Sequence, residues 1–250
     1  MRPALFAVPL PESLDRERQD RFLAVLPPER RERLARLLRP EKAHASLLGE
    51  ILVRRVLGGE LGIPWEAVRI AAGPHGKPAL ADRSGPHFNV SHSGVWVVAA
   101  FANRPVGVDV ERIRPVAAGV AASVLALEER RMLFAGAAGA GARLGPGAGT
   151  GMGTGAGLLD NAASRAFIEH WTLKESYVKM TGTGFAVPPE RLAVRRVGAR
   201  VLAEPPGLEG DAFCRRYDLD PAYALSLCSL DPRLPERVEV LEPDAVFDPG

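Results

Sequence analysis

Three runs between residues 87 and 113 constrain the fold more than any other part of the chain. They read HFNVSHSG, VWVVAAFA and VGVDVERI, and each is rich in valine and aromatic residues. Gly, Asn and Pro turns separate them, which is typical of short strands joined by tight connections. Consecutive strands with connections this short pair antiparallel. The sequence therefore predicts an antiparallel meander near the middle of the chain.

Helical patterns flank this meander on both sides. Five leucines between residues 34 and 48 give residues 27–42 an apolar face, which continues into LLGEILVRRVLGGELG. A second helix is expected over 161–180, NAASRAFIEHWTLKESYVKM, and the TGTG that follows ends it. Short strands separated by Pro and Gly turns come after that helix. Helices and strands thus occur twice along the chain, which predicts an α+β fold with two similar halves, each an antiparallel sheet packed against helices.

The predicted halves are residues 1–105 and 106–230, followed by a C-terminal tail at 231–250. Within the second half, residues 135–158 are mostly Gly and Ala and have no periodic apolar face. We expect a flexible insertion there. Its glycines do not have the spacing of a phosphate-binding loop, and no lysine follows them.

Composition excludes several classes of protein. The chain has 250 residues, of which 46% are hydrophobic and 25% charged, as in soluble globular proteins. Its net charge of +2 creates no field that would attract nucleic acid or membranes, so neither is expected as a partner. The two cysteines, Cys214 and Cys228, have no metal-site spacing and suit a reduced cytoplasmic protein. We found no signal peptide at the N-terminus and no apolar run that approaches the ~18 residues of a membrane span.

Two carboxylates in VGVDVERI are candidates for chemistry. Asp109 and Glu111 are two residues apart, so on a strand they share one face while the valines occupy the other. Adjacent carboxylates repel each other unless a cation or a proton lies between them. Oxygen ligands with this spacing suit Mg²⁺. A solvent-facing polar edge of a sheet would give the same pattern, and this alternative stays open.

The helix expected over 161–180 carries a second candidate group. Trp171, Glu175 and Lys179 are spaced i, i+4 and i+8 and therefore form a stripe along one face. A carboxylate brought to Asp109 and Glu111 would complete a site for a hard cation, and a lysine one turn on can neutralise a phosphate or assist proton transfer. A surface ion pair on an amphipathic helix is the simpler explanation of the stripe taken alone.

Together these motifs resemble a known family. FNVSHSG, VGVDVE and WTLKESYVK occur in the order and approximate spacing found in phosphopantetheinyl transferases of the surfactin-synthetase-activating type, and GKP and AHASLLGEILVR upstream match the same family. The resemblance covers most of residues 25–230. It implies a monomeric pseudo-dimer of two α+β halves folded from one chain. It also implies transfer of 4′-phosphopantetheine from coenzyme A (CoA) to a serine of an apo acyl or peptidyl carrier protein, with release of adenosine 3′,5′-bisphosphate.

The resemblance assigns roles to individual residues. Asp109, Glu111 and Glu175 would hold Mg²⁺, or Mn²⁺ in its place, on the CoA diphosphate. Glu175 would also act as the base for the carrier serine, and Lys179 would stabilise the transferring phosphoryl group or protonate the leaving group. Contacts to CoA are implied for Arg30, Arg33, Lys77, Ser91, His92 and Lys179. Glu129 occupies the family position of a further acidic residue near the metal.

Three features depart from the family pattern, and one other interpretation of the chain competes with it. Ala45 follows His44 where relatives often carry an arginine, and Thr183 stands where some have a lysine. The insertion at 135–158 lies where the family often docks its carrier, so carrier choice is hard to predict. The rival interpretation is a non-catalytic binding module that uses a basic helix at 30–42, but it leaves the three carboxylates unexplained.

Overall fold

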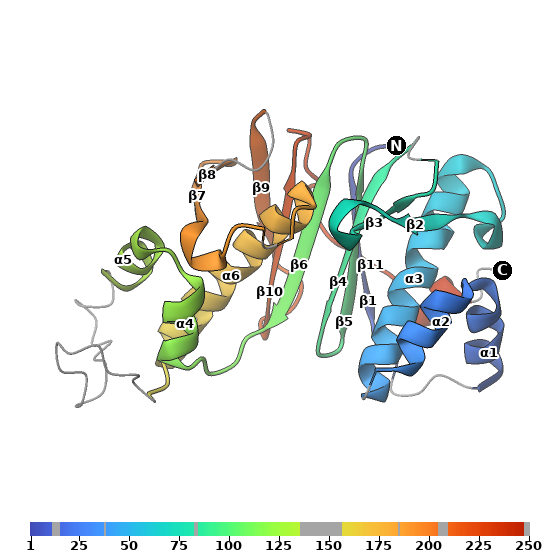
Figure 1. Ribbon diagram of the computed structural model, residues 1–250, viewed down its shortest axis with the longest axis horizontal. Coiled ribbons are helices and arrows are strands. Elements are labelled where there is room, and N and C mark those ends of the chain that lie inside the picture. The colour runs from blue at the N-terminus through green and yellow to red at the C-terminus, as the bar shows by residue number, and fades with distance from the viewer. Residues whose placement is uncertain are drawn as a thin grey trace.

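A computed structural model describes residues 1–11, 16–37, 39–82, 85–135, 157–184, 186–204 and 210–247 (Figure 1). The helices are α1 (Arg16–Val25), α2 (Pro28–Ala35), α3 (Pro40–Leu61), α4 (Ala118–Val124), α5 (Leu127–Ala135), α6 (Asn161–Thr181) and α7 (Pro243–Phe247). The strands are β1 (Ala4–Pro9), β2 (Ile70–Ala72), β3 (Pro78–Leu80), β4 (His87–Ser93), β5 (Trp96–Ala102), β6 (Val106–Arg112), β7 (Ala193–Val197), β8 (Arg200–Glu204), β9 (Ala212–Tyr217), β10 (Tyr223–Ser229) and β11 (Glu239–Val240).

Two larger sheets organise the molecule. The first has the strand order β11-β1-β5-β4, and the second has the order β6-β10-β9-β8-β7. Every pairing in them is antiparallel except that of β1 with β11. The predicted α+β class is confirmed, because each half combines a mainly antiparallel sheet with helices.

Each half contains one long helix that packs on its sheet. Figure 1 shows α3 beside the first sheet and α6 across β6 and β10 of the second. Both helices end at a glycine with positive φ, 67° at Gly62 and 71° at Gly182, the left-handed conformation that closes many helices. Neither these two nor any other helix within the described ranges has a stretch apolar enough to cross a membrane.

The helix expected over 27–42 is divided in two. α2 ends at Ala35 and α3 begins at Pro40, with Arg39 extended between them at φ −114° and ψ 117°. The ring of a proline disfavours helical geometry in the residue before it, so Pro40 starts a new helix and cannot continue the old one. The basic residues between 30 and 42 therefore do not form the single helix that the rival interpretation requires.

The expectation of a C-terminal tail is also corrected. β11 pairs with β1, and α7 places Val246 and Phe247 in the apolar core of the first half. The ring of Phe247 lies against that of Phe22, with 5.3 Å between centroids. The chain thus returns to the first half after residue 230 because its apolar side chains complete that core. Most of the insertion expected at 135–158 lies outside the described residues.

Short polar side chains join the two sheets where their edge strands β4 and β6 meet. Asn89, Ser91 and Ser93 each accept a hydrogen bond from a backbone N–H of β6, at 2.9, 3.3 and 3.1 Å. The donors, in the same order, are Val108, Val110 and Arg112. Alternate residues of a strand share one face, so a single face of β4 makes all three contacts. These bonds satisfy edge N–H groups that would otherwise be left unpaired.

Helix α6 lies directly on β6 because Gly107 has no side chain. A Cβ atom at this position would lie 2.1 Å from the carbonyl oxygen of Ser176 and 2.3 Å from the backbone nitrogen of Met180. Backbone atoms of a packed helix cannot yield to such a contact without moving the helix. Gly107 thus sets the separation between β6 and α6.

We predict that Gly107→Ala destabilises the protein by at least about 1–3 kcal/mol, the usual cost of overpacking, because the added methyl group meets the α6 backbone. Gly119→Ala is the matched control, since no atom of the described residues lies within 4 Å of a Cβ placed there. Thermal unfolding measures both variants, and each kcal/mol corresponds to about 2–4 °C in a chain of this size. Equal midpoints for the two variants would contradict the close packing of α6 on β6.

Candidate active site

The polar face of β6 carries the two predicted carboxylates toward β4. Asp109 is 3% exposed, and its Oδ1 accepts a hydrogen bond of 2.8 Å from the hydroxyl of Ser91. Glu111 accepts an equivalent bond of 2.8 Å from the hydroxyl of Ser93. Each serine therefore accepts from the β6 backbone and donates to a β6 carboxylate. Asp109 and Glu111 are held by the same contacts that join the two halves.

Helix α6 adds a cation to this group. The ammonium of Lys179 lies 2.5 Å from Oδ1 of Asp109 and 3.0 Å from the hydroxyl oxygen of Ser91. The second carboxylate oxygen of Asp109, Oδ2, is buried and has no hydrogen-bond partner within the described part of the chain. The fold thus brings together Ser91, Asp109 and Lys179 from three different elements and leaves one strong acceptor oxygen unused.

The site disfavours negative charge on all three carboxylates. Burial raises the pKa of Asp109, although Lys179 opposes the shift. Burial, together with the charge of Asp109, raises the pKa of Glu111. Burial and then the charges of Asp109 and Glu111 raise the pKa of Glu175 to about 7. A proton or a metal ion would relieve the repulsion among these carboxylates, of which Asp109 is buried and the other two are partly buried.

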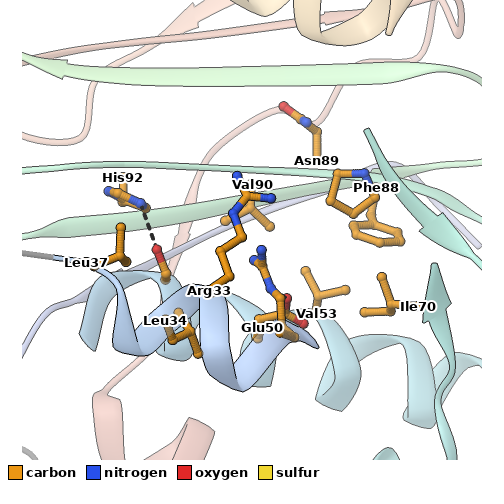
Figure 2. A pocket seen from close by; sticks show the side chains of 14 residues that line it. Arg33, Leu34, Leu37, Glu50, Val53, Ile70, Phe88, Asn89, Val90 and His92 are labelled. Atoms are coloured by element: carbon orange, nitrogen blue, oxygen red, sulfur yellow. Dashed lines mark hydrogen bonds and ion pairs between the residues drawn. The ribbon is translucent and has the colours of Figure 1, made fainter. Parts of the chain in front are cut away.

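A cavity of about 270 Å³ opens between α2, α3 and β4 (Figure 2). Arg33 reaches across it from α2, and His92 faces it from β4, with its Nε2 3.4 Å from the hydroxyl of Ser46. Arg30 also lines the cavity, where its guanidinium is paired with Glu50. Burial and the charges of Lys179 and Lys42 lower the pKa of His92. Three of the predicted CoA contacts, Arg30, Arg33 and His92, therefore share one cavity.

Lys77 is not part of that group. It lines a second cavity of about 400 Å³ together with Thr181 and Thr183, and its ammonium donates to two backbone carbonyl oxygens. The resemblance implied a contact with CoA, but the side chain is turned toward the protein interior and not toward the cavity of Arg33 and His92. Its position within GKP could be read from the sequence, but the direction of its side chain could not.

Glu129 is likewise used elsewhere, in a buried cluster that ties α5 to its neighbours. Its Oε2 lies 2.6 Å from the ammonium of Lys174, and its Oε1 lies 2.9 Å from Nε2 of His170. It also accepts hydrogen bonds from the backbone N–H groups of Ala126 and Val194. Burial alone would raise the pKa of Glu129, but the hydrogen bonds from His170 and Lys174 lower it. The expected position near a metal is corrected: Glu129 is an anchor within the second half.

Sequence reasoning missed two residues of the site. Asn89 and Ser93 alternate with Ser91 in NVSHS, and this spacing of two was the signal that all three face the same neighbour. Trp171 lies one turn before Glu175 on the same helix, and its ring is stacked parallel to that of Phe167, with 6.4 Å between centroids. It belongs to the apolar cluster between α6, α4 and α5.

Comparison with known proteins connects this arrangement to a family. The model of the 4′-phosphopantetheinyl transferase N-terminal region matches residues 15–104, and that of the 4′-phosphopantetheinyl transferase superfamily matches residues 105–228. The chain belongs to the 4′-phosphopantetheinyl transferase superfamily. The two matches meet between β5 and β6, where the side chains of β4 join the two sheets of the transferase.

Similar proteins occur in bacteria and mammals. The transferase is 29% identical over 244 residues to the 4′-phosphopantetheinyl transferase ffp of Bacillus subtilis, a match that covers 97% of this chain and 99% of the relative. It is 28% identical over 239 residues to the 4′-phosphopantetheinyl transferase Sfp of Bacillus subtilis strain 168, covering 95% and 96%. A mouse relative, L-aminoadipate-semialdehyde dehydrogenase-phosphopantetheinyl transferase, is 28% identical over 171 residues, covering 66% of this chain and 51% of its own.

We predict that Glu129→Gln lowers the free energy of unfolding by about 3–5 kcal/mol, because it leaves the buried ammonium of Lys174 without its counter-charge. Glu128→Gln is the matched control, because Glu128 is the next residue along the helix and its side chain is exposed. Chemical denaturation of both variants measures the difference. If Glu129→Gln is as stable as the wild type but has lost transfer activity, Glu129 acts in the reaction and is not a structural residue.

Proposed function

We propose that this transferase moves 4′-phosphopantetheine from CoA to a serine hydroxyl of an apo acyl or peptidyl carrier protein, in a reaction that depends on Mg²⁺ and releases adenosine 3′,5′-bisphosphate. The observation that carries the proposal is the buried Asp109 carboxylate: Lys179 contacts one oxygen, and no described residue forms a hydrogen bond with the other. A solvent-facing polar edge would not bury such a group or crowd it with Glu111 and Glu175.

The donor set fits a hard divalent cation. Carboxylate oxygens are the ligands that Mg²⁺ prefers, and Oδ2 of Asp109 is an acceptor without a partner. Over the described ranges, no three His, Cys, Asp or Glu side chains form a ready metal cage. Mg²⁺ does not require one, because it usually takes one or two carboxylates and completes its shell with water and substrate phosphates. Asp109, Glu111 and Glu175 would hold it, and Mn²⁺ suits the same ligands.

Bound there, the ion would neutralise the charge of the CoA diphosphate. The side chains of the protein supply the remaining steps. Glu175, directly or through a water molecule, accepts the proton of the carrier serine. The serine oxygen forms a bond to the phosphorus that carries pantetheine, and the bond from that phosphorus to the bridging oxygen breaks. Lys179 can leave Asp109 to neutralise or protonate the departing oxygen of adenosine 3′,5′-bisphosphate.

The cavity beside α2 suits the other end of CoA. Arg33 and His92 face it, Ser46 lines it, and Glu50 holds Arg30 at its wall. Guanidinium groups bind phosphate through several parallel hydrogen bonds. We assign this cavity to the 3′-phosphate of CoA. His92, which lines the cavity, and Ser91, which contacts Asp109, are adjacent residues of β4. One strand therefore links the two ends of the proposed substrate site.

Helices α4 and α5 carry three exposed large apolar side chains. Val120, Leu127 and Met132 are each about half exposed, at 51%, 56% and 50%. A carrier protein that binds these side chains would lie beside α6, which carries Glu175.

The metal assignment predicts that Asp109→Asn and Glu175→Gln each reduce transfer at least about 100-fold, since each removes a ligand and Glu175→Gln also removes the base. Mass spectrometry of apo carrier proteins incubated with CoA and Mg²⁺ measures the transfer. Asp218→Asn, a change at an exposed aspartate, is the control and should behave as the wild type. A chelator should abolish wild-type transfer, and Mg²⁺ or Mn²⁺ should restore it. Near-wild-type transfer by Asp109→Asn at limiting Mg²⁺ would contradict the assignment.

The phosphate assignment predicts that Arg33→Ala raises KM for CoA about tenfold or more, the usual effect of losing a charge-assisted phosphate contact. Dephospho-CoA lacks the 3′-phosphate, so its KM should not change in the variant. Arg31→Ala is the matched control, since Arg31 is exposed on the same helix and does not line the cavity. Equal KM values of the wild type for CoA and dephospho-CoA would show that the cavity does not bind the 3′-phosphate.

A further inference from the structure

Lys77 begins in a tightly closed turn of the first half. The turn at 74–76 joins β2 to β3, and the N–H of Gly73 donates to the carbonyl oxygen of Lys77 at 2.7 Å. His75 adopts a φ of 57° in this turn, which is uncommon for a residue with a side chain. The backbone at Lys77 is therefore held in place by the hairpin that carries it, independently of the second half.

The side chain of Lys77 crosses to the second half. Its ammonium donates to the carbonyl oxygen of Val106 at 3.0 Å and to that of Met180 at 3.1 Å. Val106 is the first residue of β6, the strand that carries Asp109 and Glu111. Met180 lies in the last turn of α6, next to Lys179. One ammonium thus bonds to both elements that supply the reacting side chains.

The end of α6 favours such a contact. The last carbonyl groups of a helix lack partners within the helix, and a cation there also interacts favourably with the helix dipole. The stem of Lys77 passes close to Gly182, where a Cβ atom would lie 3.1 Å from its Cδ. Burial lowers the pKa of Lys77 to about 8, and its ammonium donates hydrogen bonds to two backbone carbonyl oxygens. This geometry is that of a side chain that links the backbone of β6 to the backbone of α6.

We infer that Lys77 is a positioning residue: it holds the start of β6 against the end of α6 and so sets where Lys179 and Glu175 stand relative to Asp109. This inference rests on the proposed function. Gly107 fixes how closely the two elements approach, and Lys77 restrains how they slide along each other. Misplacement of reacting groups by about 1 Å can cost about 100-fold in rate, so such a restraint has consequences for turnover.

The role differs in a measurable way from a contact with CoA. A residue that binds CoA raises KM when it is removed, whereas a residue that positions the reacting groups lowers kcat. We expect Lys77→Met to lower kcat at least tenfold while KM for CoA changes less than about threefold. Arg69→Gln, which removes an exposed cation just before β2, is the control and should leave both constants unchanged.

Chemical rescue tests whether the ammonium itself is needed. Lys77→Cys treated with 2-bromoethylamine regains an ammonium on a side chain of nearly lysine length, and both native cysteines are buried and protected from the reagent. We expect kcat to recover to within about threefold of the wild type. Lys77→Gln, which keeps a donor on a shorter stem, gives the same comparison of kcat and KM if the methionine variant does not fold. A raised KM with unchanged kcat, or no recovery after alkylation, would overturn the inference.

Amide hydrogen exchange provides a reading that does not depend on transfer. In Lys77→Met, the amides of residues 106–108 and 178–182 should exchange at least tenfold faster, while the strands of the first sheet exchange as in the wild type. Unchanged exchange rates in both segments would exclude the proposal that Lys77 holds β6 against α6. A wild type that exchanges as expected but transfers nothing would refute the proposed function and leave the contact of Lys77 intact.

Discussion

Hydrogen bonds from the backbone of β6 to the side chains of Asn89, Ser91 and Ser93 join the edge strands of two different sheets. Short hydroxyl and amide groups reach the N–H groups that backbone pairing would otherwise use. A hydroxyl can accept and donate at once. Ser91 and Ser93 therefore hold the carboxylates of Asp109 and Glu111 while they join the halves. Assembly of the two halves and assembly of the site are one event.

The site that results is electrostatically incomplete. Burial raises the pKa values of Asp109, Glu111 and Glu175, and the charge of Asp109 raises those of the other two further. Lys179 compensates part of this charge, and among the described residues Oδ2 of Asp109 has no hydrogen-bond partner. Buried polar groups in a folded protein are normally satisfied, and exceptions concentrate at functional positions. The close packing at Gly107 holds α6, which carries Glu175 and Lys179, against the strand that carries Asp109 and Glu111.

Local periodicity explains how much of the site could be predicted. A spacing of two on a strand put Asp109 and Glu111 on one face, and a spacing of four on a helix put Glu175 and Lys179 on another. Contacts between residues far apart in the sequence could not be predicted from local spacing. Lys179 and Asp109 are 70 residues apart, and nothing local distinguishes their pairing from that of Glu129 with Lys174. The family resemblance placed Lys77 near CoA, but it could not show that its ammonium turns to backbone carbonyls.

The sequence by itself determined the order of helices and strands, the faces on which polar residues gather, and the motifs that identify the family. Backbone geometry controls these features over a few residues, so they can be read from spacing alone. The tertiary structure decided that β4 meets β6 through side chains, that the chain end returns to complete the first core, and which buried cation neutralises which carboxylate. Burial and charge pairing depend on all elements packed around a group, and that packing exists only in the folded molecule.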